Sequence, residues 1–103
     1  MFRLALPFIA ALAACATTDP PQPELTAARE MVAQARSAAG TEAPAELAAA
    51  QGKLARAESA MQRGHYEHAR LLAEQAQADA KLAWTNAEKA RAERALRQER
   101  SGT

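Results

Sequence analysis

The hydrophobic residues in the last four fifths of the chain follow a helical repeat. They recur at alternating steps of three and four residues, which places them on one face of an α-helix. Pro44 is typical of a helix start, whereas Gly40 and Gly64 favour helix ends. The pattern therefore predicts three helices, over about residues 24–39, 44–63 and 65–100. The predicted inner faces are Leu25, Ala28, Val32, Ala35 and Ala39 in the first helix, and Leu47, Ala50, Leu54, Ala57 and Met61 in the second.

The third predicted helix is the longest, and alanine fills its inner face. Alanine lets two helices approach more closely than leucine would, but it buries less apolar area. At about 1.5 Å per residue this helix is roughly 50 Å long, so the part beyond Trp84 would extend past the second helix. We expect an all-α fold, a helical hairpin or a small three-helix bundle, with a thin core of alanine and leucine. The predicted seam is Ala69, Ala73, Ala76, Ala80, Ala83, Ala87 and Ala90.

Residues 1–14 have the pattern of a secretory signal peptide. Arg3 supplies a positive charge, and the run from Leu4 to Ala14 contains no charged residue. This apolar run is too short to span a bilayer as a helix, which takes about 20 residues. A short basic start, an apolar run of this length and small residues at its end are typical of a cleaved leader.

The end of this leader, Leu12-Ala13-Ala14-Cys15, resembles the lipobox of bacterial lipoproteins. In that family the leucine and the small residues mark the leader, which is cut just before the cysteine, and the cysteine thiol carries a diacylglycerol. The resemblance implies that Cys15 anchors the protein in a membrane. The alternatives are an ordinary cleaved signal peptide with a cysteine nearby, or a buried or catalytic cysteine.

The residue after Cys15 indicates the membrane in which such an anchor would lie. In enteric-type lipoproteins an aspartate at this position favours the inner membrane, and here the residue is Ala16. We therefore expect a location in the cell outer membrane, on its periplasmic side. Residues 15–23 would be an acylated cysteine and a tether, because three prolines disfavour helix and hold the chain extended. The helical domain would occupy residues 24–103.

The junction between the second and third helices resembles the turn of a tetratricopeptide helix pair. In such pairs a glycine permits the reversal, a tyrosine packs into the hairpin and a later alanine allows close approach of the helices. Gly64, Tyr66 and Ala69 match these three positions. A tetratricopeptide array repeats at about 34 residues, and no second copy occurs, so the resemblance implies one hairpin and not a solenoid.

Residues 43–83, preceded by a lipoprotein leader, resemble the domain-of-unknown-function 4398 family of small bacterial envelope proteins. Members of this family are alanine-rich, helical and usually exported. No activity is assigned to the family. The resemblance therefore implies a helical fold and a location in the cell envelope, and it implies no catalysed reaction.

Charge and composition argue against several classes of function. The formal net charge is +1, so the chain lacks the basic excess of a nucleic-acid-binding protein. His65 and His68 could share a helix face, but two ligands do not make a closed zinc site. Glu67 beside them would lie on a solvated surface, and we interpret both histidines as turn and surface residues. We expect no enzymatic activity, no cofactor, no metal and no small-molecule substrate.

The last part of the third helix carries bases that form a candidate contact surface. One interpretation is a solvated helix end, where the bases suit the negative end of the helix dipole. The other is an electrostatic contact with an anionic partner such as phospholipid, lipopolysaccharide or peptidoglycan. The residues concerned are Lys89, Arg91, Arg94, Arg97 and Arg100.

These features lead to one main hypothesis and one alternative. The main hypothesis is a lipid-anchored outer-membrane lipoprotein that acts as a non-enzymatic structural or adaptor element of the cell envelope. Its overhanging third helix would contact a second copy or another envelope protein, because its alanines, with Leu82 and Trp84 nearby, would otherwise stay exposed to water. The alternative is an accessory binding module that docks a periplasmic protein or wall polymer through its C-terminal helix.

Overall fold

The structure is a computed structural model that describes residues 19–102. Every regular element in that part of the chain is an α-helix, and the helices are α1 (Gln22–Ala39), α2 (Pro44–Gln62) and α3 (Tyr66–Gly102). Three helices with a long C-terminal member confirm the predicted all-α small bundle. The predicted start of the second helix at Pro44 is also confirmed.

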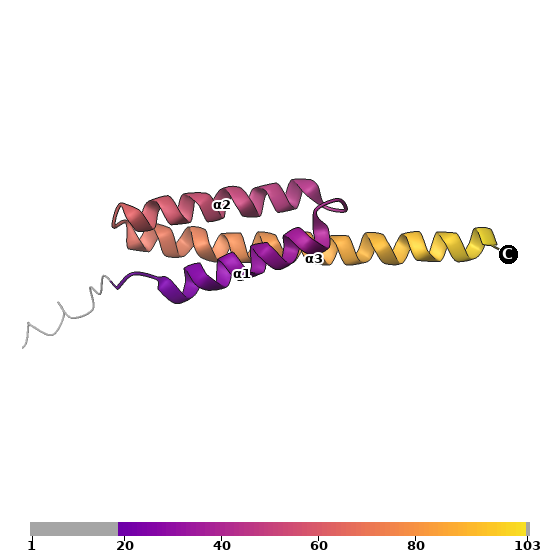
Figure 1. The fold of residues 1–103 in the computed structure, drawn as a ribbon, viewed down its shortest axis with the longest axis horizontal. Helices are drawn as coiled ribbons and strands as arrows, with labels where there is room; N and C mark the ends of the chain where they lie inside the picture. The colour runs from indigo at the N-terminus through magenta and orange to yellow at the C-terminus, as the bar shows by residue number, and fades with distance from the viewer. Residues whose placement is uncertain (1–18, 103) are drawn as a thin grey trace, which may run out of the picture.

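The helices run in opposite directions in turn, so that α2 is antiparallel to its two neighbours (Figure 1). Glu24 of α1 contacts Gln77 of α3, and Ala38 contacts Arg91, so α1 runs parallel to α3. As Figure 1 shows, α3 continues well past the ends of the other two helices. The start of α1 and the turn between α2 and α3 therefore lie at one end of the bundle, and the last turns of α3 lie at the other.

The core follows the predicted helix faces closely. All five predicted residues of α1 are buried. Six of the seven predicted alanines of α3 are buried, and Ala90 is half-buried. In α2 the fit is looser: Leu54 and Met61 pack against the core while staying partly exposed, and Ala60 is buried in addition. Because α1 also lies along α3, the buried seam of α3 extends beyond Trp84 to Ala87.

Small side chains determine how closely the helices approach. Among the described residues, the buried hydrophobic positions within the helices and their connections are alanine except for Leu25, Val32, Leu47 and Leu72. An alanine removes little apolar area from water, so each contact contributes less than a leucine contact would. The close backbones recover part of the difference through dispersion attraction. The bundle therefore depends on the fit of many weak contacts.

The start of α1 corrects the predicted tether. The helix begins at Gln22, and Pro23 lies within its first turn, so residues 22 and 23 are helical and not extended. Pro21 is fully buried at the helix N-terminus. The first amide groups of a helix have no intrahelical acceptor, so a proline there loses no hydrogen bond and its fixed φ suits the helix. A cluster of prolines is therefore compatible with a helix start.

The turn between α2 and α3 is closed by a Schellman motif. Gly64 has φ of +80°, and its N–H donates to the Met61 carbonyl at 3.1 Å. The N–H of His65 donates to the Ala60 carbonyl at 2.9 Å. These two bonds satisfy carbonyls that the end of α2 leaves without partners. The turn glycine thus has the predicted backbone role, and Ala69 is fully buried where the two helices meet.

Two glycines of α2 and its turn should respond to alanine in opposite directions. Gly64→Ala should lower the free energy of unfolding by about 1–2 kcal/mol, because an L-residue is strained at positive φ. Gly52→Ala, in the middle of α2, should raise it by about 0.5–1 kcal/mol through helix propensity. An added Cβ meets no atom within 4 Å at either position, so crowding contributes to neither change. Guanidinium unfolding measures both, and a Gly64→Ala variant as stable as the original would contradict the turn geometry.

The alanine seam should not tolerate a larger side chain. Ala76→Leu, at a fully buried position of α3, should lower the free energy of unfolding by about 1–3 kcal/mol, because the added methylenes force the helices apart. The matched control is Ala78→Leu, at an exposed position of the same helix, which should change stability by less than about 0.5 kcal/mol. Urea unfolding monitored by circular dichroism compares the two. Equal midpoints would mean that the helices are not in close contact at Ala76.

Candidate functional site

The predicted lipidation site lies outside the described residues. Leu12, Ala13, Ala14 and Cys15 all precede residue 19, and their roles stay predictions. The bundle nevertheless limits where that site could be, because α1 starts seven residues after Cys15. Within residues 19–102, the helices are all too polar to be a membrane-crossing segment.

The structure divides the predicted basic residues of α3 into two groups, and the first group serves the bundle itself. The Arg91 guanidinium donates a hydrogen bond to the carbonyl of Ala38, in the last turn of α1. A carbonyl in the last turn of a helix has no N–H donor within that helix, so it is free to accept this bond. Arg94 Nη2 lies 2.9 Å from the Oε2 of Glu42, in the connection between α1 and α2. These two arginines hold the end of α1 and its following turn against α3.

The second group has exposed side chains, and all its members except Lys89 lie on the part of α3 that leaves the bundle. Lys89, Arg97 and Arg100 are exposed. Every residue from 92 to 102 is exposed as well, and we call residues 92–102 the projecting end of α3. The buried seam stops before it, because Ala87 is the last buried alanine of α3. The candidate contact surface is therefore this projecting end, in which Arg97 and Arg100 are exposed and Arg94 is paired with Glu42 of the bundle.

Exposed hydrophobic side chains on α3 do not form a continuous patch. Leu71, Leu82 and Leu96 are each about half exposed. At 3.6 residues per turn these positions fall within about 40° of one another around the helix, but 11 and 14 residues apart along it. Trp84, 46% exposed, lies on another side. Single exposed apolar residues are ordinary on protein surfaces, so their placement alone selects no partner.

The turn residues Tyr66 and Ala69 lie in the first turn of α3. Tyr66 is the first residue of α3 and is half-buried, and Ala69 follows one turn later. His65 and His68 line a shallow groove beside this turn together with Arg56, Ser59 and Arg63. Across residues 19–102, the structure contains no cluster of three or more histidine, cysteine, aspartate or glutamate side chains suited to a metal ion.

Sequence reasoning missed Arg56 and Arg63, and it did not foresee the two contacts of Arg91 and Arg94. A signal for the groove was present: Arg56 and Arg63 are seven residues apart and so share one side of α2. The contacts to Ala38 and Glu42 had no such local signal. They depend on α1 lying parallel to α3, which brings together residues about fifty positions apart.

Removing the two bundle-facing arginines should loosen the end of α1. The double variant Arg91→Gln, Arg94→Gln should lower the free energy of unfolding by about 1 kcal/mol, since both side chains are partly exposed and screened. Amide hydrogen exchange should rise over residues 38–43 and stay unchanged near Gly64. Arg97→Gln, on the projecting end, is the control and should alter neither quantity. Unchanged exchange in the double variant would show that these contacts do not hold α1.

A comparison with known families identifies the chain. The model of a domain of unknown function, DUF4398, matches residues 23–99. The match begins in the first turn of α1, includes the turn at Gly64 and ends in the projecting end of α3. Neither the curated proteins nor the solved structures contain a protein that matches. Because the family model covers well over half of the sequence, the chain belongs to the domain-of-unknown-function 4398 family.

Proposed function

We propose that the protein is a lipid-anchored, non-enzymatic structural or adaptor element of the bacterial cell envelope. In this proposal Cys15 carries the acyl chains, in the outer membrane, and the helical bundle faces the periplasm. The single observation that supports the arrangement is that the bundle has two different ends. The end where α1 begins, which leads back to Cys15, is opposite to the projecting end of α3 (Figure 1).

The distance between the proposed anchor and the bundle is short. The seven residues from Cys15 to Gln22 span at most about 25 Å when fully extended. The turn between α2 and α3 lies at the same end of the bundle as the start of α1, so an anchored protein would hold this turn beside the bilayer. A helix of 37 residues is about 55 Å long. An upright α3 would therefore place its projecting end far from the lipid surface.

An acylated cysteine is a physically sufficient anchor for such a chain. One acyl chain holds a protein only reversibly, whereas two or three hold it firmly, at about 0.8 kcal/mol for each buried methylene. The bundle offers no continuous apolar face for membrane binding, because its exposed apolar residues on α3 are scattered along the helix. In the proposed arrangement attachment comes from Cys15 alone, and the bundle serves as a spacer and support for α3.

Mass spectrometry of the native protein tests the anchor. The protein purified from membranes should begin at Cys15 and carry a diacylglycerol on the thiol. A full chain with Cys15→Ser should leave the membrane fraction after carbonate washing, and Ala16→Ser, a matched neighbour, should stay in it. A native protein with a free thiol at Cys15, or one that starts elsewhere, would contradict the proposal. So would a Cys15→Ser chain found with the outer membrane at the original level.

A second candidate function is an accessory binding module that acts through the projecting end. The observation in its favour is that every residue from 92 to 102 is exposed, and that these residues carry acidic and basic side chains in nearly equal number. Crosslinking in intact cells separates a binding module from a passive structural element. A binding module should give one stoichiometric partner, and the contact should be lost when Leu96 is changed to aspartate. A passive structural protein should give only copies of itself or no specific product.

A further inference from the structure

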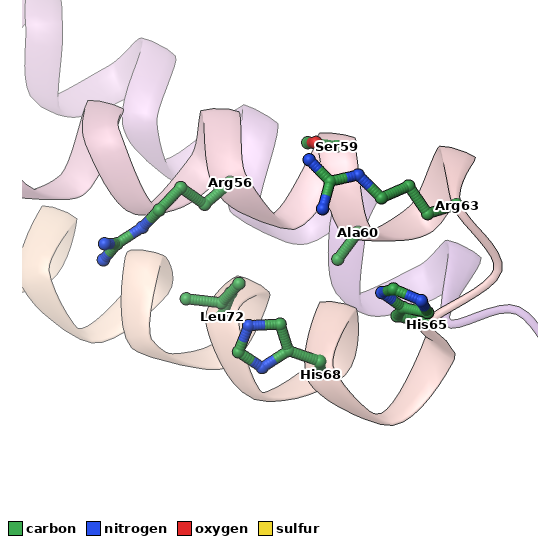
Figure 2. A pocket seen from close by; sticks show the side chains of 7 residues that line it. All are labelled: Arg56, Ser59, Ala60, Arg63, His65, His68 and Leu72. Carbon is green, nitrogen blue, oxygen red and sulfur yellow. The ribbon is translucent and has the colours of Figure 1, made fainter.

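A small groove lies between α2 and α3, beside the turn that joins them (Figure 2). Its volume is about 160 Å³. Figure 2 shows that its polar side chains come from both helices: Arg56, Ser59 and Arg63 from α2, and His68 from α3, with His65 in the turn. Two arginines, two histidines and a serine thus line one opening, and the Arg56 side chain extends along it away from the two histidines.

Helical spacing explains why these residues meet. The three residues from α2 are three and four positions apart, so they lie on one side of that helix. On α3, His68 and Leu72 are one turn apart and face the same opening. The Schellman turn brings the two sides together. Ala60 and Leu72, both buried, form the apolar floor beneath the polar groups.

The acidic residues of this end of the bundle lie on another side. Arg29 Nε is 2.8 Å from the Oε2 of Glu58. Arg70 pairs with Glu67 at 2.8 Å and with Glu24 at 3.6 Å, which places these carboxylates toward α1. The hydrogen bond from Arg70 to Glu67 raises the pKa of the Arg70 guanidinium. No carboxylate lines the groove, so the charge there is positive and local.

The arginines of the groove are not needed as hydrogen-bond donors to the last carbonyls of α2. Backbone N–H groups of Arg63, Gly64 and His65 already occupy the last carbonyls of that helix. Arg56 lies about two turns before the helix end, beyond the range in which the dipole favours a positive charge. Among residues 19–102, no carboxylate lies within ion-pair distance of Arg56 or Arg63. The structure of the bundle therefore leaves this charge uncompensated.

We propose that this groove binds a phosphate group. Guanidinium groups suit phosphate because their planar N–H donors match two of its oxygens at once. The Ser59 hydroxyl and the ring N–H groups of His65 and His68 offer further donors to the same anion. The groove is smaller than the roughly 300–1,000 Å³ of pockets that take whole cofactors. Its ligand is thus a single phosphate group, either free in solution or at the head of a phospholipid.

The position of the groove bears on the choice between these sources. The groove lies beside the Gly64 turn, at the end of the bundle where α1 begins. An anchor at Cys15 would hold that end near lipid headgroups; this orientation rests on the proposed function, whereas the phosphate site itself does not. The two sources share the same chemistry, and they can be separated by the probe used.

Titration of the full chain with inorganic phosphate tests the site. All variants carry Cys15→Ser, so acylation contributes to none of them and the result is independent of the proposed anchor. Amide signals of residues 56–72 should shift saturably in nitrogen-15 NMR when phosphate replaces chloride at constant ionic strength. In the double variant Arg56→Gln, Arg63→Gln the dissociation constant for phosphate should rise about tenfold, as expected for two partly exposed charge contacts. The control Arg36→Gln, Lys81→Gln removes the same charge from two exposed positions elsewhere and should leave it unchanged.

Vesicle flotation with the same three chains identifies the source of the phosphate. The probes are phosphatidylcholine vesicles with and without about 30% phosphatidylglycerol. Groove-dependent binding of inorganic phosphate supports the site with free phosphate as its ligand. Groove-dependent binding of the phosphatidylglycerol vesicles alone supports the site with a lipid headgroup as its ligand. Equal losses in the two double variants, or no saturable response to either probe, would overturn the proposal.

Discussion

The close approach of α3 to its two partners is the contact on which the rest of the bundle depends. Alanines of α3 take part in both halves of the core, one with residues of α1 and α2 near Val32, the other with residues near Leu25. Leu54 of α2 packs against both halves and joins them. Each contact is weak because an alanine buries little area. The stability of a domain this small is accordingly a sum of many small terms with little margin.

Polar contacts around this core determine register more than they add stability. Lys53 pairs with Asp79 at 2.8 Å between α2 and α3, and Arg29 pairs with Glu58 between α1 and α2. Pairs with this degree of exposure contribute at most about 1 kcal/mol each. An alanine seam alone would fit almost as well when shifted by one helical turn, because its side chains are all alike. Charged pairs at fixed positions remove that ambiguity and so select a single alignment of the helices.

The sequence was informative where the contrast between neighbouring residues was strong. Five of the seven alanines of the α3 seam have a charged residue directly beside them, so the repeat identified the buried positions almost completely. The start of α1 was wrong by two residues because the cluster of three prolines was taken to disfavour helix, although Pro23 is tolerated in a first turn. The contacts of Arg91 and Arg94 could not be predicted, since they require the parallel placement of α1. The groove was missed for a related reason: its two sides come from helices that the turn folds together.

The start of α1 and the end of α3 lie at opposite ends of the molecule, and this arrangement has a mechanical consequence. A tension applied between the start of α1 and the end of α3 acts along the contact of two parallel helices. It tends to slide α1 past α3, so every alanine contact along their shared length resists at the same time. If the start of α1 and the end of α3 lay at one end of the bundle, the same force would peel the helices apart one contact after another. A seam that is weak at each point is thus suited to withstand pulling along its axis.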